Sequence, residues 1–248
     1  MIDVSVAINL HREGALARGT LLSAARAIEV ATAEGWSCET LAVVDRGDEA
    51  TREAVAAFGG GLRVEPCDFG DLGAARNHGV ARANGEMIAF MDGDDLMGER
   101  WLTVAARAVH EHADKRVVVH PRYNYMFGGD DPPFLLTQPD MIETPLDPRL
   151  LIFANLWTSL VFARAEVFRA FPYPANDLEA GFGYEDWSWN FATVNAGVLH
   201  LAPEEGVHFI RRKTAGSLHA RSREAAILPN LWGRPRPRND QGPQTLTT

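Results

Sequence analysis

The chain has 248 residues, of which 46% are apolar, enough to form one large α/β domain or two small ones. Its 33 acidic side chains outnumber the 24 basic ones and give a net charge of −9, which argues against a general nucleic-acid-binding protein. Cys38 and Cys67 are the only cysteines, so we expect neither a disulfide framework nor a cysteine metal cluster.

Strands and helices are predicted to alternate through the first 120 residues. Short apolar or β-branched runs indicate strands, and longer segments with apolar residues at helical spacing indicate helices. In chain order the predicted strands are 4–8, 39–44, 62–64, 87–91 and 116–120, and the predicted helices are 16–33, 50–58, 72–83 and 99–112. This order predicts an α/β fold with an open, mostly parallel sheet flanked by helices and right-handed crossovers.

The alternation weakens after Pro121. Five prolines between Pro132 and Pro148 disfavour regular structure there, and residues 151–162 form an apolar run. The remaining predicted elements are short helices at 164–170 and 187–195 and short strands at 198–201 and 207–210. The composition of residues 233–248 predicts a disordered tail. The N-terminus lacks the features of a secretion signal, and no run is long enough to span a bilayer. We therefore expect a cytoplasmic protein, with peripheral membrane attachment left open.

Three carboxylates follow the predicted strand 87–91: Asp92, Asp94 and Asp95. Ligands of open α/β sheets bind beyond the carboxyl ends of the strands, so these side chains lie where a ligand would lie. Closely packed carboxylates repel one another, and Mn²⁺ or Mg²⁺ relieves the repulsion together with substrate phosphates. The alternative is a solvated turn, because Asp and Gly are common turn residues.

Two further candidates belong to the same half of the chain. Asp45 ends a strand as Asp92 does, and its carboxylate can accept hydrogen bonds from a base or a ribose; alternatively, it caps a helix or forms a turn. Arg76, near the start of the next helix, can contact phosphate or brace Asp92, and the alternative is a surface ion pair.

The second half offers an acidic pair and a basic stretch. Glu185 and Asp186 follow a Gly-Phe-Gly-Tyr loop, where a carboxylate can take a proton from an attacking hydroxyl, although stabilisation of a helix start is the alternative. His208 precedes Arg211, Arg212 and Lys213. Such a basic stretch can close over a diphosphate, and His208 could then complete the metal site. A lone histidine on a strand is more often structural.

Residues 73–79 and 83–95, read together, resemble the "ARN-x-G … GE-x-I-x-F-x-D-x-DD" run of GT-A fold glycosyltransferases of the family 2 type. The resemblance covers roughly Val4 to Ser217. It implies that Asp45 holds the base, that Asp92 lies near the ribose and that Asp94 ligates Mn²⁺ or Mg²⁺.

The same resemblance extends to the second half. Glu185–Trp187 matches the family's "ED-W" motif, which implies Asp186 as the catalytic base with Glu185 beside it. Residues 207–211 resemble an "H-x-x-R" element, which implies His208 as a metal ligand and Arg211 as a phosphate contact; Gly216–Ser217 matches the end of the catalytic region. The chain differs from the family in its 9–12 segment and in carrying Lys213 and Thr214 where family members often carry histidine.

The resemblance implies inverting transfer of a sugar from a nucleoside-diphosphate sugar to an acceptor hydroxyl. We expect residues 1–120 to form the nucleotide-sugar-binding half of a single domain and residues 121–232 its acceptor and catalytic half. The acceptor could be a glycan, a lipid-linked molecule or a small molecule. A nucleotidyltransferase and a non-catalytic nucleotide- or sugar-binding module remain as alternatives.

Overall fold

The computed structural model describes residues 1–213 and 227–231, so the predicted tail at 233–248 and the Gly216–Ser217 match lie outside it. Within these residues the central sheet has seven strands, in the order β11-β6-β9-β4-β1-β2-β3. From one edge to the other they are β11 (Leu199–Leu201), β6 (Val117–Val119), β9 (Phe162–Arg164), β4 (Met87–Asp92), β1 (Val4–Leu10), β2 (Cys38–Asp45) and β3 (Leu62–Cys67). All neighbouring strands are parallel except β9, which runs antiparallel to both β4 and β6. The predicted mostly parallel α/β sheet is therefore confirmed.

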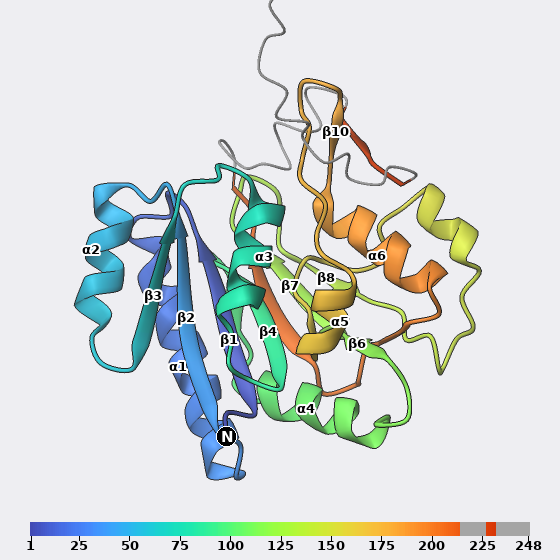
Figure 1. The fold of residues 1–248 in the computed structure, drawn as a ribbon, viewed down its shortest axis with the longest axis horizontal. Helices are drawn as coiled ribbons and strands as arrows, with labels where there is room; N and C mark the ends of the chain where they lie inside the picture. The colour runs from blue at the N-terminus through green and yellow to red at the C-terminus, as the bar shows by residue number, and fades with distance from the viewer. Residues whose placement is uncertain (214–226, 232–248) are drawn as a thin grey trace, which may run out of the picture.

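Helices cover both faces of this sheet (Figure 1). On one face lie α1 (Leu16–Ala33) and α4 (Trp101–Glu111), with α2 (Glu49–Phe58) packed beside α1. On the other face lie α3 (Leu72–Arg82), α5 (Ala165–Ala170) and α6 (Glu185–Asn195). A short 3₁₀ helix, η1 (Pro148–Ile152), lies next to α6. None of the described helices is long and apolar enough to cross a membrane.

Two small sheets extend the molecule beyond the central one. One has the order β5 (Leu96–Met97), β12 (Val207–Arg211), β7 (Tyr123–Phe127), β8 (Phe134–Thr137). The other pairs β10 (Phe182–Gly183) with β13 (Leu228–Pro229). The first sheet lays β12 beside β5, the strand that follows the acidic turn, so it carries the basic stretch toward that turn.

The structure corrects several of the predicted boundaries. Strand β1 continues through Asn9 and Leu10, beyond its predicted end at residue 8, because β2 pairs with both residues and β4 pairs with Asn9. Strand β3 continues past Pro66, which is tolerated because β3 is an edge strand. Strands β7 and β8 were missed: the prolines that disfavoured them lie between and after the strands rather than inside them. Strand β9 was also missed, because its residues fall at the end of the apolar run 151–162 and at the start of the helix predicted from residue 164.

A buried pair of histidines links the sheet to α6. His120 Nε2 lies 2.9 Å from His200 Nδ1, His200 Nε2 lies 2.9 Å from the Thr193 hydroxyl, and His120 Nδ1 lies 3.1 Å from the Leu160 carbonyl. The ring of Trp157 packs against both imidazoles. Burial lowers the pKa of His120 to about 3 and lowers the pKa of His200 well below its ordinary value. Both histidines are therefore neutral in the folded protein at neutral pH.

Acidification should destabilise the fold through this histidine pair. An unfolded histidine takes up a proton as the pH falls through about 6.5, and a buried neutral one does not, so stability is lost below that pH. We expect the free energy of unfolding to fall between pH 7 and pH 5 by about 2 kcal/mol less in His200→Asn than in the wild type. Urea unfolding at both pH values measures this difference. Equal losses in the two proteins would show that His200 does not carry the effect.

Candidate active site at the carboxyl edge of the sheet

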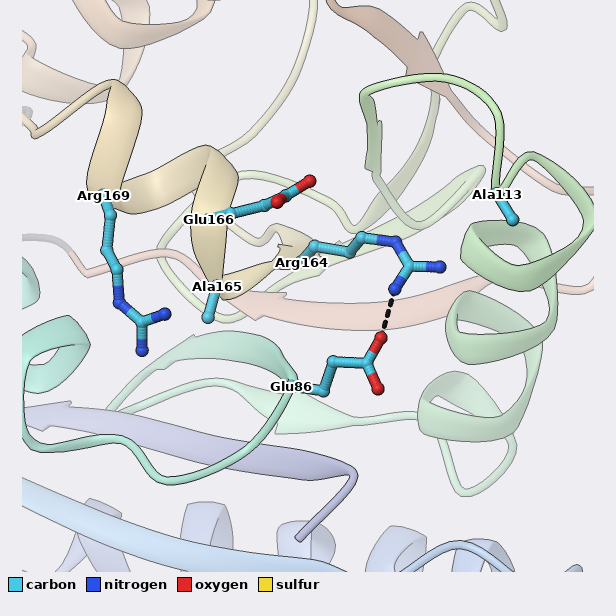
Figure 2. A pocket seen from close by; sticks show the side chains of 6 residues that line it. All are labelled: Glu86, Ala113, Arg164, Ala165, Glu166 and Arg169. Carbon is cyan, nitrogen blue, oxygen red and sulfur yellow. Dashed lines mark hydrogen bonds and ion pairs between the residues drawn. The ribbon is translucent and has the colours of Figure 1, made fainter. Parts of the chain in front are cut away.

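A pocket and the predicted site lie at opposite ends of the strands of the central sheet. A pocket of about 430 Å³ lies near the amino end of β4, where Glu86 pairs with Arg164 (Figure 2). Asp92 ends the same strand, so the predicted site lies at the opposite edge of the sheet. The predicted site and this pocket are therefore separate parts of the molecule.

Three neighbouring strands carry polar side chains at or next to their carboxyl ends, and these side chains share one face. A Cβ atom on Gly79 of α3 would contact Ala7, Val43 and Phe90, so these residues point toward α3. Side chains two positions further along a strand point the same way, which directs Asn9, Asp45 and Asp92 toward the first turns of α3. Asn9 is 5% exposed, and neither atom of its amide has a hydrogen-bond partner among the described residues. Asn9 was not predicted as a site residue, although it directly follows the predicted strand 4–8 and is the penultimate residue of β1.

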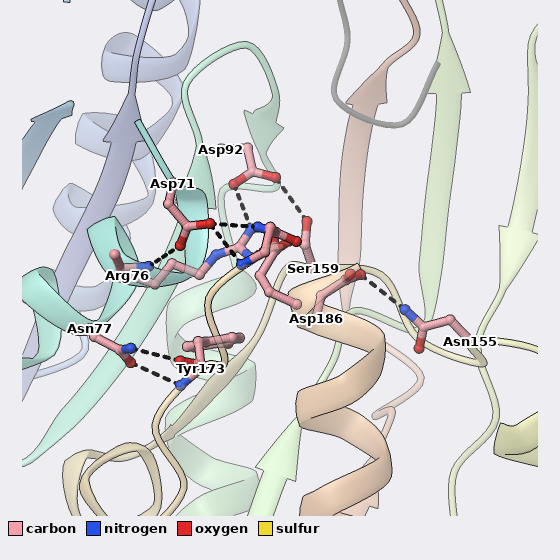
Figure 3. A network of polar contacts seen from close by, with 11 residues as sticks. Asp71, Arg76, Asn77, Asp92, Asn155, Ser159, Tyr173 and Asp186 are labelled. Carbon is pink, nitrogen blue, oxygen red and sulfur yellow. Dashed lines mark hydrogen bonds and ion pairs between the residues drawn. The ribbon is translucent and has the colours of Figure 1, made fainter. Parts of the chain in front are cut away.

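Arg76 lies at the centre of this site (Figure 3). Its guanidinium is 0% exposed and donates to Asp92 Oδ1 at 3.0 Å and to Glu185 Oε1 at 2.6 Å. The ring of Tyr173 lies 5.2 Å from the guanidinium carbon. Burial alone would lower the pKa of Arg76, but the charges of Asp92 and Glu185 raise it above its ordinary value. The arginine therefore stays charged and binds α3, β4 and α6 together.

Asp186 follows Glu185 in the first turn of α6. It is half-buried, and its Oδ2 accepts a hydrogen bond from Asn155 Nδ2 at 2.9 Å. Burial and the neighbouring charge of Glu185 raise the pKa of Asp186 to about 7, although Arg76 acts in the opposite direction. A carboxyl group that titrates near neutral pH can both accept and release a proton under physiological conditions.

Two side chains that the sequence analysis missed hold these carboxylates. Ser159 donates to Asp92 Oδ2 at 2.8 Å, so both oxygens of Asp92 are hydrogen-bonded, and Asn155 contacts Asp186 as described. Both side chains come from the segment between η1 and β9. The sequence analysis predicted an apolar run at 151–162. The few polar residues inside that run were the only sign that the segment contributes to the site.

The basic stretch of β12 lies against the acidic turn. Arg211 donates from its backbone N–H to Asp95 Oδ1 at 2.8 Å and from Nε to the Asp94 carbonyl at 3.2 Å. The ammonium of Lys213 lies 2.8 Å from Asp94 Oδ2. Arg212 points elsewhere, since its guanidinium donates to the carbonyls of Asp131 and Pro132. The structure therefore brings Arg211 and Lys213 to the site and directs Arg212 away from it.

His208 is fully buried on β12, paired in register with Met97 and Asn124. Neither ring nitrogen has a hydrogen-bond partner among the described residues, and burial lowers the pKa of the imidazole to about 3. A neutral imidazole with an unshared nitrogen is suited to bind a metal ion. However, the described residues hold no group of three or more His, Cys, Asp or Glu side chains arranged as a metal site. The cation that contacts the Asp94 carboxylate here is Lys213, and metal ligation by Asp94 and His208 stays a prediction.

Asp45 holds the turn that leads into α3. Its carboxylate accepts hydrogen bonds from the backbone N–H groups of Phe69 at 2.7 Å, Gly70 at 3.0 Å and Asp71 at 3.2 Å. Asp71 in turn caps α3 by accepting from the Ala74 N–H. A pocket of about 350 Å³ lies beside this turn, lined partly by Phe69 and Asn176. Asp45 thus shapes the wall of the site, and its contact with a base stays a prediction.

Comparison with known proteins gives the following matches. The family model "Glycosyl transferase family 2" matches residues 5–165. TarS of S. aureus, residues 1–349 in complex with UDP-GlcNAc, is 18% identical with a TM-score of 0.63, and the match covers 88% of this chain and 61% of that one. Glucosyl-3-phosphoglycerate synthase from Mycobacterium tuberculosis, in complex with Mn²⁺, UDP and phosphoglyceric acid, is 16% identical with a TM-score of 0.61, covering 91% and 76%.

These matches differ in what they cover. Against a longer TarS structure, 18% identical with a TM-score of 0.60, the match covers 85% of this chain but only 37% of TarS. The chain thus spans 37% and 61% of these two TarS structures, which is less than two thirds of either. At these identities the likeness to solved structures shows the fold. No match was found among curated protein sequences.

Removing the positive charge of Arg76 should destabilise the protein strongly. Arg76→Met leaves the buried Glu185 and the partly exposed Asp92 without their cation, and breaking a buried ion pair typically costs about 3–5 kcal/mol. The double variant Arg76→Met/Glu185→Gln should recover part of this loss. Urea unfolding measures both changes. Arg26→Met is the matched control, because Arg26 pairs with Glu29 and Glu99 on the surface and should have little effect. A change in Arg76→Met as small as the control's would contradict the buried ion-pair network.

Proposed function

Because the chain belongs to glycosyl transferase family 2, we propose that it transfers a sugar from a nucleoside-diphosphate sugar to an acceptor hydroxyl, with inversion at the anomeric carbon. The observation that carries this proposal is the gathering of Asp92, Arg76 and Asp186 at one edge of the sheet (Figure 3). UDP-GlcNAc and UDP are bound by the structural neighbours, which supports a nucleotide-sugar donor. Residues 1–120 supply the donor side, and residues 121–232 supply the acceptor side.

Asp186 is the general base in this proposal. Its carboxylate takes the proton of the acceptor hydroxyl while the hydroxyl oxygen bonds to the anomeric carbon and the bond from that carbon to the diphosphate breaks. Glu185 is already bound to Arg76, so in this proposal proton transfer falls to Asp186. A pKa raised to about 7 suits Asp186 to this task, because the best base titrates near the working pH.

The leaving diphosphate needs positive charge next to it. Arg211 and Lys213 lie on the acidic turn and offer a guanidinium and an ammonium. Asp94 and His208 would hold Mn²⁺ or Mg²⁺, which when bound neutralises the charge developing on the diphosphate. Neighbouring structures that contain UDP with Mn²⁺ or with Mg²⁺ support this choice of ions. Lys213 pairs with Asp94 Oδ2 in the structure, so a metal ion held by that oxygen would take the place of the Lys213 ammonium.

Asp186→Asn should remove most of the turnover and leave donor binding intact. An amide cannot take the proton, and losing a positioned general base typically costs ~10²–10⁴-fold in rate. UDP release from UDP-sugars measures turnover, and calorimetric titration with UDP measures binding. Asp3→Asn is the control, since Asp3 precedes β1 at the opposite edge of the sheet. Turnover that stays near normal in Asp186→Asn would refute the base assignment and favour a non-catalytic binding module.

Asp94→Ala should abolish the part of donor binding that depends on Mn²⁺. The carboxylate is the predicted oxygen ligand of the ion, and a hard cation depends on such ligands. The shift in melting temperature produced by UDP with and without Mn²⁺ reports this linkage. Asp130→Ala, at an exposed loop position, is the control. An unchanged Mn²⁺-dependent shift in Asp94→Ala would exclude Asp94 as the metal ligand.

A further inference from the structure

Asn155 is the residue that contacts the proposed base, and nothing in the sequence motifs assigns it a role. It lies in the segment that links η1 to β9, and its Nδ2 lies 2.9 Å from Asp186 Oδ2. Figure 3 shows the two side chains pointing toward each other across the start of α6. This inference rests on the proposed function, because it concerns how Asp186 is made ready to act.

The orientation of the Asn155 amide is fixed by a second asparagine. Asn190 is 2% exposed and donates from its Nδ2 to Asn155 Oδ1 at 2.9 Å. An amide nitrogen can only donate, so the Asn155 oxygen must face Asn190 and its nitrogen must face Asp186. Asn190 lies four residues after Asp186 on α6, which places both on the same side of the helix. The two contacts therefore hold Asn155 from both ends.

The other groups around Asp186 favour its uncharged form more than its charged form. Burial, Glu185 and Asp92 oppose ionisation, whereas Arg76 and a hydrogen bond from the backbone N–H of Trp187 favour it. The charges of Arg76, Glu185 and Asp92 also act on the phenol of Tyr173. Burial raises the pKa of this phenol, so it stays neutral. A neutral amide N–H donated to one carboxylate oxygen stabilises the ionised form without adding charge. Asn155 supplies this donor from the acceptor half of the chain.

We propose that Asn155 is a positioning residue that holds the Asp186 carboxylate in the orientation and the charge state needed to accept the proton of the acceptor hydroxyl. Asn155 itself neither gains nor loses a proton in this step. The proton passes from the hydroxyl to Asp186, the hydroxyl oxygen bonds to the anomeric carbon, and the diphosphate leaves with the bonding electrons. Without Asn155 the base is protonated over more of the working pH range and is free to rotate.

The titration of Asp186 can be followed without any turnover. In protein labelled with ¹³C at the aspartate carboxyl carbons, the Asp186 signal is the one that Asp186→Asn removes. We expect Asn155→Ala to raise the midpoint of this signal by about 1 pH unit, because a hydrogen bond to a charged group is lost. Asn155→Asp keeps the side-chain volume and should also raise the midpoint, because a second carboxylate repels the first. Asn195→Ala, which removes an exposed amide from the same helix, should leave the midpoint unchanged.

The pH profile of turnover separates positioning from a general loss of structure. With UDP-sugar hydrolysis as the assay, the acid limb of kcat in Asn155→Ala should move to higher pH with the NMR midpoint, and kcat at pH 7 should fall about 10-fold. The KM for the UDP-sugar should stay unchanged, because Asn155 contacts Asp186 and Asn190 and neither residue is proposed to bind the donor. Midpoints that match the wild type in both Asn155 variants would overturn the inference. A wild type that releases nucleoside diphosphate from none of the nucleoside-diphosphate sugars would instead refute the proposed function, and the NMR titration would still decide whether Asn155 sets the titration of Asp186.

Discussion

The buried ion pairs of Arg76 are the interaction on which the site depends. A guanidinium cannot lose its charge in a protein, so once it is buried it must be surrounded by carboxylates and hydrogen-bond acceptors. Asp92 and Glu185 meet this requirement from a central strand and from a helix that begins 93 residues later, counted from Asp92 to Glu185. The requirement fixes the start of α6 against the end of β4. Because Arg76 binds both elements, it also sets how far Asp92 on the donor side lies from Asp186 on the acceptor side.

The same arrangement divides the work between two adjacent carboxylates. Glu185 is committed to the arginine, whereas Asp186 keeps a neutral amide as its partner and titrates near pH 7. Two chemically similar side chains thus acquire different properties from their surroundings alone, as happens in enzymes that use pairs of acids. On the donor side, Asp92 has both oxygens bound by Arg76 and Ser159, so its carboxylate is held in one orientation before any ligand arrives.

The sequence predicted those features that depend on local patterns. The first four strands, α1 and the acidic turn follow from periodicity and chain order, and the resemblance in 73–95 pointed to Arg76 and Asp92. Strand β9 and the residues Asn155 and Ser159 were missed because their surroundings are made by segments far away in the chain. Nothing local distinguishes Asn155 from any other asparagine in a loop. Lys213 shows the same limit, since its charge could be predicted but its pairing with Asp94 could not.

The antiparallel strand β9 has a consequence for how the chain is made. It fills the space between β4 and β6, two strands that precede it by more than forty residues in the sequence. A nascent chain that has emerged only as far as β6 would carry an open sheet edge at β4, which is the kind of surface that recruits other strands. Synthesis through residue 164 closes that edge from within. The central sheet is therefore completed late in biosynthesis. Until then, we expect the nascent chain to depend on chaperones that cover the open strand edge.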